Sequence, residues 1–127
     1  MKISIIAPEK IQTKYSKDAI KEYNKRLGAF TKVDYKVTKD VPKNAYVIQI
    51  DPTGENISSE ELAQKIDHLT IHGNSHIAFI LDAESEYPAD CTLSLTMMDL
   101  DADLLTVILF EQVYRAFTII HNRTYHK

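Results

Sequence analysis

The stretch LLTVILFEQVYRAFTIIHNRTYHK, residues 104–127, ends the sequence and decides its fold. From Leu104 to Ile120 it is apolar on almost every side, with a few Thr, Glu, Gln and Arg residues between. A helix that is apolar all round is buried all round, while Glu111 and Arg115 make this one a poor membrane span. In a chain of 127 residues, the pattern predicts that a second subunit covers one face of the helix.

The composition is that of one soluble globular domain. Hydrophobic residues make up 44% and charged residues 26% of the chain, which suits a single core. The apolar run at residues 1–6 is too short for a secretion signal, and there is no transmembrane or lipidation signal. The single Cys91 has no partner for an internal disulfide and is expected to be a small buried hydrophobe. A cytoplasmic protein is therefore expected.

Charge is distributed unevenly along the chain. Residues 1–43 carry eleven Lys and Arg against five Asp and Glu, whereas residues 44–111 carry one Lys against thirteen acidic residues. Seven of those acids lie between Asp82 and Asp103, a region without Lys or Arg that would repel phosphate. The basic end favours a phosphate-rich partner, and an unevenly charged solvated surface is the alternative of about equal weight.

Hydrophobic periodicity and turn residues predict alternating strands and helices. We expect strands over residues 2–7, 33–37, 45–50, 76–81 and 91–98, and helices over 13–27, 59–71 and 104–120. Gly28 is expected as a left-handed C-cap, and residues 51–54 as a turn that closes the third strand. Ser58 or Ser59 caps the second helix, and Asp101 or Asp103 the third. The class is α/β with a mainly parallel sheet and flanking helices.

Several common sites are excluded. Gly28, Gly54 and Gly73 are the only glycines, so there is neither a Walker loop nor a dinucleotide fingerprint. No Ser-His-Asp arrangement follows from spacing. The remaining histidine series, at 68, 72 and 76, lacks a carboxylate or thiol to complete a ligand set, so no metal is predicted.

Aromatic and cationic residues stand together at the end of the chain, in Tyr114-Arg115 and in the tail 125–127. Such pairs can stack bases and neutralise phosphates. Two alternatives stay open for the helix. Tyr114 can belong to the core or to a dimer interface, and Arg115 can pair with Glu111 one turn earlier.

The segment 111–117, Glu-Gln-Val-Tyr-Arg-Ala-Phe, followed by the terminal Tyr-His-Lys, resembles the RlmH family. These are SPOUT-superfamily methyltransferases that act on a pseudouridine of 23S ribosomal RNA. The first strand, the pattern from Tyr15 to Gly28 and the helix start at residues 58–63 are also similar to the family. The resemblance covers nearly the whole chain, which is interpreted as a single SPOUT domain, 1–127.

The resemblance implies a trefoil-knotted α/β fold, an exception to the rule that chains are unknotted. It also implies a homodimer packed through the C-terminal helix and S-adenosylmethionine held by the knotted loops. The tail would reach the cofactor site of the partner subunit and contact ribosomal RNA or the ribosome. The candidate RNA-binding residues are Arg115, Arg123, Tyr125, His126 and Lys127.

The chain departs from the family pattern at the cofactor positions. The family's Gly-Gly-x-x-Gly loop falls at Asp82, Ala83 and Glu86, and its Phe-Pro-His falls at Leu100, Asp101 and Ala102. Its arginine in the last helix falls at Thr106, and a helix is missing around residues 38–44. Added side chains fill the space that glycine leaves for a ligand, and carboxylates repel the carboxylate of the cofactor.

These departures favour a relative with impaired or lost S-adenosylmethionine binding, which acts as a dimeric RNA- or protein-binding module and needs no cofactor. The alternative is an active, S-adenosylmethionine-dependent methyltransferase acting on N3 of a pseudouridine in ribosomal RNA.

Overall fold

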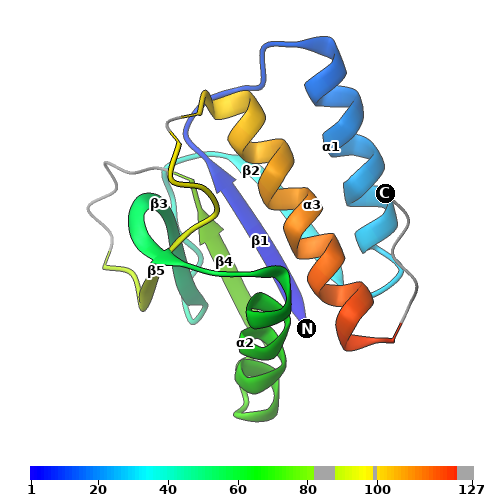
Figure 1. Cartoon of the computed structure of the whole chain (residues 1–127), viewed down its shortest axis with the longest axis vertical. Helices are drawn as coiled ribbons and strands as arrows, with labels where there is room; N and C mark the ends of the chain where they lie inside the picture. The colour runs from blue at the N-terminus through cyan, green and yellow to red at the C-terminus, as the bar shows by residue number, and fades with distance from the viewer. Residues whose placement is uncertain (82–87, 99, 123–127) are drawn as a thin grey trace.

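Five parallel strands form one sheet in the computed structural model, which describes residues 1–81, 88–98 and 100–122 (Figure 1). The elements in chain order are β1 (Lys2–Ala7), α1 (Lys14–Leu27), β2 (Lys32–Val37), β3 (Tyr46–Asn56), α2 (Ser59–Ile71), β4 (His76–Ile80), β5 (Cys91–Ser94) and α3 (Ala102–Ile120). The strand order is β2-β1-β4-β3-β5, and every neighbouring pair is parallel. The predicted α/β class and parallel sheet are confirmed.

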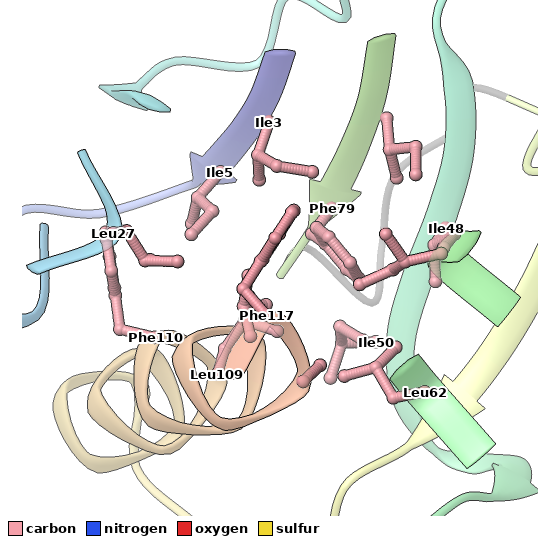
Figure 2. Close-up of a cluster of buried hydrophobic side chains, with 14 of the residues drawn as sticks. Ile3, Ile5, Leu27, Ile48, Ile50, Leu62, Phe79, Leu109, Phe110 and Phe117 are labelled. Atoms are coloured by element: carbon pink, nitrogen blue, oxygen red, sulfur yellow. The ribbon is translucent and has the colours of Figure 1, made fainter. Parts of the chain in front are cut away.

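All three helices pack on the same face of this sheet. One core cluster joins Ile3 and Phe79 of the strands to residues from each helix, and Figure 2 shows Leu109, Phe110 and Phe117 of α3 turned toward the strands. Leu109 and Phe110 have no exposed surface. Burying a side chain of this size contributes about 1.5–3 kcal/mol, so α3 is the main apolar cover of the sheet.

The opposite face of the sheet carries a smaller apolar cluster of Ile6, Val47 and Ile80. Val41 and Ala89, which lie in connections between strands, pack on it. Residues 38–45 run from the end of β2 to the start of β3 without a helix, as the missing family segment predicted. A parallel strand must be entered from the same end as its neighbours, and this connection makes the return through bends and a turn, with Val41 packed on the far-face cluster.

Polar residues of α3 are directed to the N-terminus of α2. Ser59 Oγ donates a hydrogen bond to Gln112 Oε1 at 2.5 Å, and Arg115 lies 4.0 Å from Glu60. Gln112 also donates to Glu111 at 2.6 Å. Gln112 and Arg115, two polar residues of the otherwise apolar α3, therefore have partners on α2 of the same chain.

The cap of α2 follows from its sequence. Ser58 accepts a hydrogen bond from the backbone of Glu61, whose side chain accepts one from the backbone of Ser58. The backbone N–H of Ser58 lowers the pKa of Glu61, because it stabilises the carboxylate. Asp101 caps α3 by accepting from Leu104 at 2.8 Å, so the first of each pair of predicted caps is the residue used.

Three local predictions are wrong. Gly28 is right-handed (φ −58°), and the left-handed glycine is Gly73 (φ 90°) after α2. The turn at residues 51–54 does not end β3, which continues to Asn56. Instead the pairing with β5 shifts there, because Leu93 is opposite both Ile50 and Glu55. The fifth strand is also shorter than predicted and ends at Ser94.

Glycine is required where β3 shifts its register. A Cβ at Gly54 would lie 2.8 Å from backbone atoms of Leu93 and Thr92. Backbone cannot yield as the tip of a side chain can, so only glycine lets residues 51–54 leave the ladder and return to it. This excursion forms one wall of the pocket described below.

None of the described helices combines the length and the hydropathy needed to cross a bilayer.

Candidate functional site: a pocket at the strand ends

A cavity of about 210 Å³ lies where the carboxyl ends of the strands meet the first turn of α3. In an open parallel sheet this edge is where ligands bind. The walls come from four segments: the β3 excursion, the residue after β4, the segment after β5 and the start of α3. The described lining residues are Ile50, Asp51, Pro52, Leu81, Leu95, Thr96, Met98, Leu100, Ala102 and Leu105.

The lining is mostly apolar, and Asp51 supplies its one formal charge among the described residues. The Asp51 carboxylate accepts a hydrogen bond from Thr53 N–H at 3.2 Å, which fixes the turn of the β3 excursion. Across the pocket, Thr96 accepts from Met98 N–H through its hydroxyl at 3.1 Å and from Ser94 through its carbonyl at 2.7 Å. Both polar walls are therefore held by local hydrogen bonds.

The structure brings two of the predicted cofactor residues into this pocket. Leu100 and Ala102 line it, whereas Asp101 is occupied as the cap of α3. Thr106, at the position of the family's arginine, is 2% exposed and donates to the Ala102 carbonyl at 2.7 Å. Asp82, Ala83 and Glu86 lie outside the described residues, although Leu81 just before them is part of the wall.

Residues 50–52, 95–96 and Leu105 are pocket residues that the sequence interpretation missed. The signal for the first group was present, because a polar turn after a buried strand of a parallel sheet is a usual ligand position. The composition of residues 51–54 by itself predicts only the end of a strand. Leu105 belongs to an apolar helix in which no pattern separates pocket residues from core residues.

The first turn of α3 is fixed by a carboxylate that reaches another helix. Asp103 accepts hydrogen bonds from Gln12 N–H, from Thr13 N–H at 2.9 Å and from the Thr13 hydroxyl at 3.1 Å. Thr13 is the N-cap position of α1, whose own side chain makes no capping bond. The N-termini of α1 and α3 are thus joined, and the pocket wall formed by Ala102 and Leu105 is held in place.

The aromatic residue of the predicted RNA-binding pair belongs to the fold of the monomer. The Tyr114 ring lies 5.9 Å from Tyr23 and 6.2 Å from Phe30, and the Arg26 guanidinium lies over it at 5.9 Å. This contact supports the core interpretation of Tyr114. The other RNA-binding candidates, Arg123, Tyr125, His126 and Lys127, lie outside the described residues.

The histidine series is divided between different contacts. His72 hydrogen-bonds through Nδ1 to the His68 carbonyl at 2.8 Å, and His76 Nε2 lies 2.7 Å from Ser4 Oγ. Burial, assisted by Lys2, lowers the pKa of His76. Among the described residues, no group of three or more His, Cys, Asp or Glu could hold a metal ion.

Cys91 is half-buried at the start of β5, and burial raises the pKa of its thiol. A raised pKa leaves little of the reactive thiolate at neutral pH. The geometry therefore gives no support for a nucleophilic role.

The family model described as "Predicted SPOUT methyltransferase" matches residues 1–126. Similar proteins agree with it. The chain is 36% identical over 159 aligned positions to ribosomal RNA large subunit methyltransferase H of Ruminiclostridium cellulolyticum, with both chains fully covered. The chain belongs to the RlmH family of SPOUT methyltransferases. The expected family membership is confirmed.

Other RlmH relatives extend the comparison. Ribosomal RNA large subunit methyltransferase H 1 of Thermoanaerobacter sp. is 42% identical over 125 positions, covering 93% of this chain and 92% of its own. The enzyme named methyltransferase H in Bifidobacterium adolescentis is 35% identical over 159 positions, with full coverage of both. Alignments of 159 positions to a chain of 127 residues contain gaps, so these relatives have residues that this chain lacks.

We predict that Asp103→Asn destabilises the protein near neutral pH and has a smaller effect in acid. The Thr13 backbone N–H, followed by Gln12 and the Thr13 hydroxyl, lowers the pKa of Asp103 in the folded state. A lowered pKa contributes stability above the carboxyl's ordinary value, and this stability is lost as the pH falls through the folded value. Thermal unfolding at pH 7 and below about pH 4 measures the difference.

The matched control is Asp18→Asn, which removes an exposed carboxylate from α1. It should leave the acid dependence of the melting temperature close to that of the wild type. An Asp103→Asn variant with the wild-type melting temperature at pH 7 would show that the contacts of Asp103 with Gln12 and Thr13 do not stabilise the fold.

Proposed function

We propose that the chain transfers a methyl group from S-adenosylmethionine to large-subunit ribosomal RNA, with N3 of a pseudouridine as the acceptor. The observation that carries the proposal is the membership of the RlmH family along the whole chain, together with a pocket at the carboxyl ends of the strands of its sheet. The trefoil knot of the family is part of the same proposal.

The described pocket residues fit part of this cofactor. Apolar walls such as Leu81, Leu95 and Leu105 suit a flat, weakly polar adenine ring. The Asp51 carboxylate suits ribose hydroxyls or the sulfonium cation, because it offers hydrogen-bond acceptors and negative charge. The volume of about 210 Å³ is below the roughly 300–1,000 Å³ of common ligand sites, so a whole cofactor would extend past the described wall.

When bound, S-adenosylmethionine supplies an electrophilic methyl carbon on its sulfonium. The residues of this chain would orient the cofactor and exclude water from it. Leu100, Ala102 and Leu105 exclude water beside α3, and Asp51 favours a cation at the opposite wall. Holding the acceptor nitrogen in line with the methyl group accounts for a large share of the rate in such reactions, since entropy is lost on binding rather than in the chemical step.

A second candidate is the non-catalytic relative favoured by the cofactor-loop substitutions. The observation in its favour is electrostatic. No Lys, Arg or His is among the described pocket residues, and Thr106 stands buried where a cation would pair with the carboxylate of the cofactor. This module would bind RNA or protein as a dimer and leave the pocket without a methyl donor.

Calorimetric titration with S-adenosylmethionine separates the two candidates. We expect saturable binding by the wild type and binding about tenfold weaker for Asp51→Asn, because the loss of a charge-assisted contact costs on the order of 1.5–3 kcal/mol. The amide is isosteric and keeps an acceptor for Thr53. Asp67→Asn, an exposed change on α2, is the matched control and should bind as the wild type does.

Absence of heat from the wild type at millimolar cofactor would reject the methyltransferase and favour the non-catalytic module. Equal affinities of the wild type and Asp51→Asn for S-adenosylmethionine would be compatible with the activity but would show that the methyl donor does not bind in this pocket.

The homodimer implied by the family is proposed to form through the outer side of α3. Leu104 is 47% and Ile119 37% exposed, and half-buried Ile108 lies between them at helical spacing. Helical spacing places these three apolar residues on one side of α3, together with Arg115, which lies 4.0 Å from Glu60 at the start of α2. The tail, with Arg123, Tyr125, His126 and Lys127, would then contact RNA near the site of the partner subunit.

We predict that Leu104→Glu combined with Ile119→Glu converts dimers to monomers, because two charges would be buried in an apolar interface. Sedimentation or size-exclusion chromatography with light scattering measures the mass. Ile71→Glu changes an exposed apolar residue of α2 that is 72% accessible and should leave the dimer intact. A double variant with the wild-type mass would exclude this side of α3 as the interface.

A further inference from the structure

We propose that a groove between α1 and the edge strand β2 binds a single-stranded segment of the RNA substrate. The inference deepens the proposed function and rests on it, since it names the surface that holds the RNA. Two adjoining hollows of about 780 and 420 Å³ form the groove, and both are bordered by Lys21 and Asn24. We call this surface the α1–β2 groove.

Five lysines surround the α1–β2 groove, and no carboxylate is among its described lining residues: Lys10, Lys17, Lys21, Lys25 and Lys32. In the described part of the chain, the salt bridges join Lys2 and Lys36 to Asp34, Arg26 to Glu22, and Arg115 to Glu60. None of them uses a groove lysine. Lys17 helps to lower the pKa of the Asp103 carboxyl, so part of its charge is balanced within the chain. A polyanion would neutralise the remaining positive charge of the groove.

The lysines are arranged in a row. Lys17, Lys21 and Lys25 follow one another every four residues along α1, which places them about 6 Å apart on one side of the helix. Consecutive phosphates of an extended RNA strand have a comparable spacing. Lys32, at the start of β2, faces this row from the opposite wall.

The floor between these walls is apolar and partly aromatic. It contains Phe30 and Val33 in one hollow, and Ile20, Tyr35 and Val37 in the other. Proteins that bind single strands combine a cationic track for the backbone with aromatic or apolar surface for the bases. Lysines on an edge strand alone could serve to prevent aggregation, but here the row comes from the helix.

The α1–β2 groove leads to the pocket. Its Lys10 end is next to Gln12 and Thr13, which bind Asp103 in the first turn of α3. Ala102 and Leu105 of the same turn line the pocket. An RNA strand in the groove would thus reach the methyl-donor site across one helical turn.

Fluorescence anisotropy with a labelled 12-nucleotide single-stranded RNA tests the proposal in the absence of cofactor. The groove variant is Lys21→Gln with Lys25→Gln, and the control is Lys39→Gln with Lys43→Gln, two exposed lysines at the same spacing outside the groove. Each double variant removes two positive charges. If the lysines act only through the overall charge of the protein, the two variants lose the same RNA affinity. Thermal melting verifies that each variant is folded.

We expect the groove variant to bind about tenfold more weakly than the control near 0.1 M salt. We also expect its plot of log affinity against log salt to be less steep by about 1.4, since each single-strand phosphate contact contributes roughly 0.7. Equal affinities of the two variants, no RNA binding by the wild type, or tighter binding of a poly-glutamate peptide than of RNA would each overturn the proposal.

These results do not depend on the cofactor titration. If the groove and control variants bind RNA equally well while the wild type still binds S-adenosylmethionine, only the groove proposal is contradicted. A wild type that binds RNA through the groove but takes up no S-adenosylmethionine contradicts the methyltransferase alone.

Discussion

The fixed position of α3 across one face of the sheet is the constraint on which the rest of the structure depends. Its inner side buries Leu109 and Phe110 completely against the strands. Three polar or aromatic contacts then prevent it from sliding or rotating. Asp103 joins its start to α1, Gln112 joins its middle to α2, and the ring of His121 lies 5.0 Å from Phe30 at its end. Apolar burial contributes most of the free energy that holds α3 on the sheet. These polar and aromatic contacts fix its position along and around its own axis.

Fixing this helix positions two surfaces of opposite character. The pocket lies on one side of its first turn and carries only the charge of Asp51 among the described residues. The α1–β2 groove, between α1 and the edge strand, is surrounded by lysines. A methyl donor with a cationic sulfonium and an RNA with a polyanionic backbone favour opposite potentials. The separation of charge along the sequence therefore becomes a separation in space. The pocket includes residues of the first turn of α3, and the groove is linked to that turn through Gln12 and Thr13, which bind Asp103.

The elements were predictable because their signals are local. Helices α1 and α2 follow from helical periodicity and from Ser58, and the apolar run of β4 marks a central strand. Contacts between residues far apart in the sequence could not be predicted from local patterns. Residues 51–54 have the composition of a turn, yet β5 draws the chain back into the ladder. The bond between Asp103 and Thr13 spans 90 residues, so no local pattern could reveal it. Likewise, the apolar α3 suggested a second subunit where the sheet and two helices of the same chain provide most of the cover.

Methyl transfer itself tests the account most directly. Large ribosomal subunits lacking the modification would be incubated with the purified protein and tritiated methyl S-adenosylmethionine, and the 23S ribosomal RNA would then be isolated and digested. The account predicts label in a single pseudouridine-containing fragment, and much less label with Asp51→Asn than with Asp67→Asn. Unlabelled RNA from a folded wild-type protein that binds that RNA would contradict it and identify the chain as a member of the RlmH family without methyltransferase activity.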